Sequence, residues 1–339
     1  MLRHVSNPPN PWAGQQIEYL DEIPETRLEV FEDRTRSILS HNDPAKNGFE
    51  FGLNPYRGCQ HACAYCEARR RHELLGFGAG TDFDTKIVVK AHAPALLREQ
   101  FEAPSWKGEV INFSGATDCY QPLEASYRLT RQCLEVCAEY RNPVAIVTKG
   151  ALIERDIDVL EKIRDGARVT ITISIPMWDA DAARALEPMV PTPQRRMRVV
   201  QRLADAGLDV GVSVAPLIPG LSEDGLSDLL EHAKAAGARR SVLSFLRLPA
   251  PVDAVFEARL REVMPLRADR ILARFREGGP YRDMVSALYL ATCRRLGLPT
   301  PPPGDDRVNT PPAGPLETRT FRRPPRAGDQ LGLFAARSR

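Results

Sequence analysis

The sequence predicts an α/β protein with a mostly parallel sheet, arranged as a partial (β/α)6 barrel of the TIM type. Short apolar runs rich in β-branched residues alternate with helical patterns of about 10–15 residues, which is the order of βαβ units. Five or six such units follow one another along the chain. Polar residues also gather just after the ends of the predicted strands, where barrel active sites lie. The fold class therefore also predicts the place of a site.

The chain is expected to begin with an N-terminal arm, residues 1–45, because residues 1–33 contain several prolines and few apolar repeats. A barrel with a helical cover, residues 46–297, is predicted to follow. A short strand at 50–53 would deliver a cysteine-rich loop. Residues 64–75 are then predicted to form a helix that ends at a run of glycines.

The barrel itself is predicted from the alternating elements after this helix. The predicted strands are 86–90, 109–113, 144–147, 169–175, 210–214 and 242–246, and the predicted helices are 95–101, 123–140, 152–164, 194–206 and 226–236. Residues 251–297 look helical and rich in arginine. They are expected to cover the open edge of the barrel, because exposed strand edges need covering.

The composition changes after residue 297. Residues 298–326 are rich in proline and arginine, which predicts a stiff, solvated linker that ends in a disordered tail. Residues 327–339 are read as a separate C-terminal peptide, because they turn apolar again.

The overall composition is that of an ordinary globular protein, with 43% hydrophobic residues among 339. A net charge of +2 is too small to indicate nucleic-acid binding by itself. The seven cysteines are odd in number and clustered, which favours a reducing cytoplasm over a disulfide framework. No apolar run approaches ~18 residues, so we expect no membrane-spanning segment.

Three cysteines, Cys59, Cys63 and Cys66, form the pattern C-x3-C-x2-C. Thiolates at this spacing can converge on one inorganic centre. A structural zinc site takes four ligands, and iron–sulfur clusters also prefer thiolates and often use four. A cluster held by three thiolates leaves one iron open to bind a substrate. Two alternatives stay open, namely zinc with a distant fourth ligand and cysteines that are simply buried.

This motif, with an aromatic residue, Tyr65, before its third cysteine, resembles that of the radical S-adenosylmethionine (SAM) superfamily. A wider resemblance, to the spore photoproduct lyase-related branch, extends over roughly residues 34–295. One departure is Glu67, which stands where many relatives carry a second tyrosine. The string that carries the wider resemblance comprises Asn54 to Cys66, Ala68-Arg69, His72-Glu73, Leu75-Gly76 and Asp82 to Lys86.

The resemblance implies a [4Fe–4S] cluster on the three cysteines, with SAM bound at the fourth iron. It also implies reductive cleavage of SAM to a 5′-deoxyadenosyl radical, and therefore an external electron donor as a partner. The fold that it implies is the partial barrel already predicted from the strand and helix pattern.

The resemblance further implies a SAM site built from the ends of barrel strands. Ser114 and Gly115 occupy the place that contacts the SAM amino group, and Lys149 can pair with the carboxylate. Ser174 is placed to bond the ribose, and Ile218 matches the loop that contacts the adenine. Each residue also has a plainer explanation. Ser114 and Gly115 could form a simple turn, and Lys149 could be a solvated charge. Ser174 could cap a strand, and Ile218 could belong to the core. The full candidate set is Ser114, Gly115, Lys149, Ser174, Ile218 and Tyr65.

Cys119 follows a predicted strand end and is expected on the rim of the active site. A thiol there could donate a hydrogen atom to a substrate radical, as a cysteine in this general loop does in the related lyase. The competing interpretation is a small buried thiol. Arg196 is a weaker candidate for a SAM contact, since a solvated helix face is the plainer explanation.

The expected substrate is a nucleic acid, and more narrowly a DNA lesion of the photoproduct type. Arg69, Arg70 and Arg71 and the arginine-rich tail are candidates for phosphate contacts. Two other functions remain as alternatives. One is a radical SAM enzyme that acts on a peptide or a small metabolite, and the other is a non-catalytic scaffold that holds zinc.

The C-terminal peptide contains Gln330, Leu331, Leu333 and Phe334. Together with Gly332, this stretch resembles the Q-L-x-L-F peptide by which bacterial polymerases and repair proteins bind the sliding clamp. The glutamine amide would make directed hydrogen bonds while the apolar side chains fill a groove. A chance match and a tail that folds back on its own domain are the alternatives.

Overall fold

A seven-stranded sheet with the order β11-β10-β9-β8-β7-β4-β3 forms the centre of the protein. The structure is a computed structural model and describes residues 3–5, 28–44, 49–113, 115–301 and 320–325. Within these residues the six strands from β4 to β11 run parallel, and β3 is antiparallel to β4. The predicted α/β partial barrel is therefore confirmed. The strands are β3 (Leu39–His41), β4 (Phe51–Leu53), β7 (Ile111–Phe113), β8 (Val144–Thr148), β9 (Val169–Ser174), β10 (Asp209–Leu217) and β11 (Ser241–Phe245).

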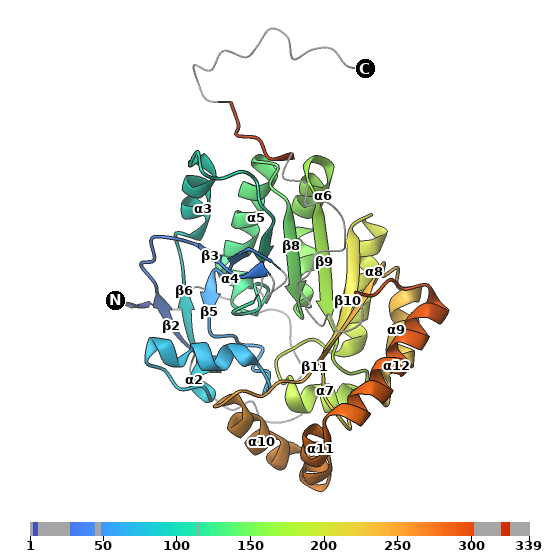
Figure 1. Cartoon of the computed structure of the whole chain (residues 1–339). Coiled ribbons are helices and arrows are strands. Elements are labelled where there is room, and N and C mark those ends of the chain that lie inside the picture. The colour runs from blue at the N-terminus through green and yellow to red at the C-terminus, as the bar shows by residue number, and fades with distance from the viewer. Residues whose placement is uncertain (1–2, 6–27, 45–48, 114, 302–319, 326–339) are drawn as a thin grey trace.

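Helices line the outer face of this sheet, as Figure 1 shows. The main core lies between the two layers, where Ile171 and Val212 pack with Leu134 and Leu229 at 0% exposure. Side chains on the opposite face of the strands, such as Ser174, are small or polar, because successive residues of a strand point to opposite faces. The helices are α2 (Thr81–Thr85), α3 (Ala93–Glu102), α4 (Glu124–Tyr127), α5 (Leu129–Glu139), α6 (Ile157–Gly166), α7 (Ala180–Leu186), α8 (Pro193–Asp205), α9 (Leu226–Ala235), α10 (Val252–Val263), α11 (Pro265–Glu277) and α12 (Gly279–Leu296).

A second, smaller sheet has the order β1-β2-β6-β5. It is built from β1 (Arg3–Val5), β2 (Glu29–Glu32), β5 (Tyr56–Arg57) and β6 (Lys86–Val89). The sequence predicted 86–90 as a strand but grouped it with the barrel, and it treated residues 29–32 as part of an extended arm. β2 and β6 pair in parallel. Their side chains Val30, Ile87 and Val89 pack with Tyr56 in a small buried apolar cluster, which stabilises this sheet.

Three predicted helices are interrupted. Residues 152–164 divide into a 3-10 helix, Ala151–Asp156, and α6. Residues 64–75 form two 3-10 helices, Glu67–Arg71 and Glu73–Leu75, because Cys66 keeps an extended backbone that delays the first turn. Residues 123–140 divide at Arg128, whose φ of 53° is left-handed and separates α4 from α5. α7 was not predicted from the sequence.

The C-terminal helices cover one side of the barrel. α12 packs against β11 and α9, which covers the edge strand as predicted. α10 and α11 bury Phe256, Leu260 and Ile271 in a cluster that also contains Cys63 and Tyr65. This second cluster supports the cysteine loop from the outside. Among the described residues, no helix is both long and apolar enough to cross a membrane.

Residues 320–325 differ from the solvated linker that the sequence predicted. The Phe321 ring packs 5.7 Å from the ring of Phe101 and 6.1 Å from that of Tyr140. Arg323 donates hydrogen bonds to the carbonyl oxygens of Phe101 (2.9 Å) and Ala103 (2.8 Å), where α3 ends. An aromatic ring and a cation at a helix C-terminus therefore hold this segment on the domain.

Candidate active site

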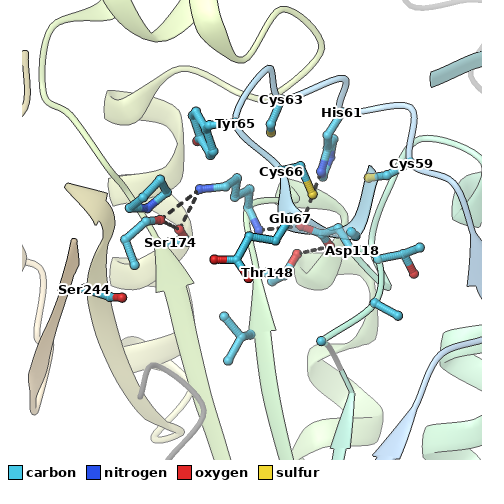
Figure 2. Close-up of a pocket in the computed structure, with 18 of the residues that line it drawn as sticks. Cys59, His61, Cys63, Tyr65, Cys66, Glu67, Asp118, Thr148, Ser174 and Ser244 are labelled. Carbon is cyan, nitrogen blue, oxygen red and sulfur yellow. Dashed lines mark hydrogen bonds and ion pairs between the residues drawn. The ribbon is translucent and has the colours of Figure 1, made fainter. Parts of the chain in front are cut away.

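A cavity of about 300 Å³ opens where the parallel strands end and the cysteine loop crosses above them (Figure 2). Its wall combines three thiols, one lysine and several small side chains. The residues that line it are Cys59, His61, Cys63, Tyr65, Cys66, Glu67, Ala68, Gly115, Ala116, Thr117, Asp118, Val147, Thr148, Lys149, Ser174, Ala215, Pro216, Ser244, Phe245, Leu246 and Arg247.

The cysteine loop is held in place by backbone contacts at both ends. Gly58 has a φ of 78°, and a Cβ there would lie 3.0 Å from the carbonyl oxygens of Phe83 and Lys86, so the turn requires glycine. Cys59 N–H donates to the Phe83 carbonyl at 2.9 Å. Further along, Ala64 N–H donates to the carbonyl of Leu186, the last residue of α7, also at 2.9 Å. These bonds direct all three thiols into the cavity.

The three thiols fit a cluster that binds each cysteine at a different iron. All three are free and line the same cavity, with Cys59 5% and Cys63 6% exposed. Burial raises the pKa of the Cys66 thiol to about 11, so a thiolate there needs a positive partner, which a metal supplies. Among the described residues, no three His, Cys, Asp or Glu side chains form a group that could hold a single metal ion.

His61 and Asp118 connect the cysteine loop to the ends of β7 and β8. His61 Nδ1 lies 3.3 Å from Asp118 Oδ2. Asp118 also accepts hydrogen bonds from the Thr148 hydroxyl (2.5 Å) and from Lys149 N–H (2.7 Å). Burial acts to raise the pKa of Asp118, but the charge of His61 and these hydrogen bonds lower it to about 2. The carboxylate is therefore a fixed anion that joins three segments of the chain.

Lys149 extends from the end of β8 toward the end of β9. Its Nζ donates to the Ser174 hydroxyl at 2.6 Å and lies 3.1 Å from Glu187 Oε1. Ser174 in turn donates to the carbonyl oxygen of Ala215 at 2.9 Å. Two of the predicted SAM-site residues, on adjacent strands, are thus brought into direct contact.

Glu187 lies at the centre of a buried ion network next to the cavity. It is 1% exposed and follows directly after α7. Its Oε1 accepts a hydrogen bond from the Tyr65 hydroxyl, and its Oε2 accepts one from Arg196 Nη2 at 2.6 Å. Burial acts to raise the pKa of Glu187, but Arg196 and Lys149 together lower it to about 2. Sequence analysis did not single out Glu187.

The remaining predicted SAM-site residues are placed less uniformly. Gly115 lines the cavity, whereas Ser114 lies outside the described residues. Ile218 is fully buried in the cluster beneath α10 and α11 and does not line the cavity, whose wall at that point is Ala215 and Pro216. The roles assigned to these residues stay predictions.

Cys119 was expected on the rim, and the structure places it in the main core at 1% exposure. Its thiol donates to the Phe113 carbonyl oxygen at 3.4 Å, and the Thr130 hydroxyl donates to the Cys119 carbonyl oxygen at 2.7 Å. These contacts turn the side chain inward, so it does not line the cavity. The packing matches the alternative of a buried core thiol, and hydrogen donation by Cys119 stays a prediction.

Arg69 is not available for the phosphate contacts that the sequence indicated. Its side chain is 2% exposed and donates to the carbonyl oxygens of Cys63 and Gly80, each at 2.9 Å, and to Asp84 at 2.8 Å. It therefore supports the cysteine loop from behind. Arg70 and Arg71 are exposed.

Comparisons with known proteins show what the chain as a whole is similar to. A family model described as the radical SAM superfamily matches residues 53–233. An uncharacterized protein of Mycobacterium tuberculosis is 36% identical over 265 residues, which cover 75% of this chain and 78% of that protein. An uncharacterized protein of Methanocaldococcus jannaschii is 28% identical over 197 residues, which cover 58% of this chain and 70% of that protein.

Solved structures with a similar fold include spore photoproduct lyase. A double mutant of that enzyme with bound AdoMet and dinucleoside spore photoproduct has a TM-score of 0.55 at 17% identity, covering 74% of this chain and 73% of that chain. The lyase complexed with dinucleoside spore photoproduct has a TM-score of 0.53 at 18% identity. The match covers 69% of this chain and 66% of that chain. At 17–18% sequence identity, this similarity shows a shared fold and nothing further.

Proposed function

Because this chain belongs to the radical SAM superfamily, we propose that it is a radical SAM enzyme that acts on nucleic acid, with a DNA lesion of the photoproduct type as substrate. The family implies a [4Fe–4S] cluster and SAM as cofactors. The observation that carries the proposal is one cavity at the strand ends, into which the three thiols, Lys149 and Ser174 all face. Barrel enzymes place their chemistry at this end of the strands.

The chain supplies a distinct group for each part of the cofactors. Cys59, Cys63 and Cys66 are assigned as the cluster ligands, and Lys149 Nζ as the partner of the SAM carboxylate. The Ser174 hydroxyl is assigned to the ribose. When bound, the cluster and SAM supply reductive cleavage of the sulfonium to a 5′-deoxyadenosyl radical, with the electron coming from an external donor.

Other residues of the cavity shield this chemistry from water. Val147, Phe245 and Leu246 give part of the wall an apolar surface. A reactive radical needs such a surface, because excluding water prevents side reactions. The protein thus mainly positions and protects its cofactors.

The nucleic-acid substrate is supported by two separate arguments. Spore photoproduct lyase, which shares the fold, has been solved with a dinucleoside photoproduct bound. In addition, Arg70 and Arg71 are exposed on the 3-10 helix that follows the cluster ligands, where they are free of the buried contacts that occupy Arg69.

The proposed protein partner is a bacterial sliding clamp, bound through Gln330, Leu331, Leu333 and Phe334. These residues lie outside the described part of the chain. A peptide of residues 325–339 titrated with a clamp should show micromolar binding by fluorescence anisotropy. Peptides with Leu333→Ala or Phe334→Ala should not bind the clamp. If the unchanged peptide does not bind at high clamp concentration, the proposed partner is wrong.

The test of the proposed function is anaerobic reconstitution followed by a SAM-cleavage assay. We expect a brown protein that forms 5′-deoxyadenosine from SAM under reduction, and that converts lesions in irradiated DNA. A colourless zinc protein would contradict the radical SAM assignment. Cleavage of SAM with no change in irradiated DNA would instead point to a peptide or a small metabolite as substrate.

A further inference from the structure

Glu187 connects several parts of the proposed SAM site that are far apart in the sequence. Its three side-chain partners are Tyr65 on the cysteine loop, Lys149 at the end of β8 and Arg196 on α8. Arg196 also donates to the Ser174 carbonyl oxygen at 2.7 Å. One carboxylate therefore touches, directly or through Arg196, three residues of the predicted SAM site: Tyr65, Lys149 and Ser174.

The backbone beside Glu187 strengthens this connection. Leu186 accepts the hydrogen bond from Ala64 N–H, so the end of α7 holds the cysteine loop at two successive positions. The two loop residues that make these contacts, Ala64 and Tyr65, lie between the second and third proposed cluster ligands, Cys63 and Cys66. A displacement of Glu187 would therefore move the loop and the lysine together.

The charges in this network also indicate its purpose. Lys149 and Arg196 are cations, and Glu187 is the single carboxylate between them. The four side chains thus carry one positive charge in excess when Tyr65 is neutral, which fits one added carboxylate. Without Glu187, two cations in a poorly solvated region would lose their shared counter-ion, and a buried charge without a partner is strongly unfavourable.

We propose that Glu187 is a positioning residue for SAM: it holds Lys149 Nζ and the Tyr65 ring in the arrangement that the bound ligand's carboxylate requires. The inference rests on the proposed function, because the ligand is SAM. Arg196 acts beside it by fixing Glu187 Oε2 and the backbone of Ser174. This assigns Arg196 an indirect role and removes the solvated helix face that the sequence had suggested for it.

The chain contains a matched control in Glu124. This carboxylate is 0% exposed, and it too accepts a hydrogen bond from a tyrosine, Tyr56, and from an arginine, Arg155, at 2.7 Å. It neither contacts Lys149 nor lines the cavity. A Glu→Gln change at the two positions is therefore the same chemical change, and the position at Glu187 is distinguished by its contact with Lys149 beside the cavity.

The experiment compares Glu187→Gln and Glu124→Gln in the reconstituted full chain. Calorimetric titration with SAM gives the affinity, and thermal unfolding and iron content report on fold and cluster. Both variants should melt at lower temperature with unchanged iron content. Only Glu187→Gln should bind SAM more weakly, by about tenfold, the size of a lost charge-assisted contact. Unchanged or tighter binding by Glu187→Gln would overturn the inference.

Two further outcomes are also decisive. If Glu187→Gln does not fold, Tyr65→Phe replaces it, since this change removes only the hydroxyl that donates to Glu187. Weaker SAM binding by Tyr65→Phe supports the positioning role, and unchanged binding overturns it. If the wild-type protein itself does not bind SAM, the proposed function fails, whatever the variants do.

Discussion

Glu124 and Glu187 are two buried carboxylates with similar partners and different neighbours. Each accepts a hydrogen bond from a tyrosine and forms an ion pair with an arginine. Glu124 also accepts hydrogen bonds from the first backbone N–H groups of α5, those of Thr130 (3.0 Å) and Arg131 (3.3 Å). Its contacts join a helix N-terminus to the small sheet, which is a structural task.

Glu187 differs by one added cation, Lys149, which reaches it from the cavity. Burial raises the pKa of Glu124, and its single ion pair with Arg155 does not reverse this. At Glu187, Arg196 and Lys149 together outweigh burial and hold the pKa at about 2. A buried glutamate paired with a tyrosine and an arginine therefore stabilises the fold at Glu124. At Glu187 the same arrangement, with Lys149 as a second cation, lies beside a candidate cofactor site.

The largest effect is expected from the cysteines. Cys66→Ala should abolish the iron–sulfur cluster, because three thiolates are the smallest set that can hold it. Cys133→Ala makes the same change in the core, at 0% exposure and away from the cavity, and should lower stability while it leaves the iron content intact. Iron analysis and visible absorption measure both. A full cluster in Cys66→Ala would mean that the ligand assignment is wrong.

The pH dependence of stability should have opposite signs at the two glutamates. The lowered pKa of Glu187 adds stability above about pH 4.5, and this is lost as the pH falls toward about 2. The raised pKa of Glu124 adds stability at low pH, which is lost as the pH rises above about 4.5. The effect at Glu187 is on the order of 3 kcal/mol across its window.

Urea unfolding of the cluster-free protein, compared with each Glu→Gln variant from about pH 7 to about pH 3, isolates these contributions. The stability advantage of the wild type over Glu187→Gln should shrink as the pH falls. The stability of the wild type relative to Glu124→Gln should instead increase as the pH falls. If both differences move in the same direction, the contrast between the two carboxylates is not electrostatic.

A smaller effect is expected from the cation that distinguishes the two sites. Lys149→Ala should weaken SAM binding by about ten- to a hundredfold, or roughly 1.5–3 kcal/mol, with the cluster intact. Arg155→Ala removes a cation beside Glu124 and should lower stability without changing SAM affinity. Calorimetry measures both variants, and equal affinity in Lys149→Ala and the wild type would count against a carboxylate contact.

Much of the fold and part of the site could be predicted because their signals are local. The parallel strands showed as apolar runs, and their C-terminal ends converge by geometry, which brought Lys149 next to Ser174. The three cysteines stand within eight residues of sequence, 59–66, so their spacing alone indicated a shared centre. These predictions required no knowledge of tertiary packing.

Other parts depend on contacts between distant segments. Nothing near Glu187 in the sequence marks it as buried, because its partners come from residues 65, 149 and 196. α7 had one usable signal, since Asp179 caps its first turn by accepting from Ala182 N–H at 2.6 Å. Cys119 was expected on the rim because it follows a strand end, but the loop turns its thiol back to Phe113.

The most direct test of the central claim is the electron paramagnetic resonance spectrum of the reduced, reconstituted protein before and after SAM is added. Three thiolates leave one iron of a four-iron cluster open, so SAM bound there should change the signal. The account predicts a changed spectrum in the wild type, and in Lys149→Ala the same change only at higher SAM concentration. A cluster whose spectrum is identical with and without saturating SAM would contradict it.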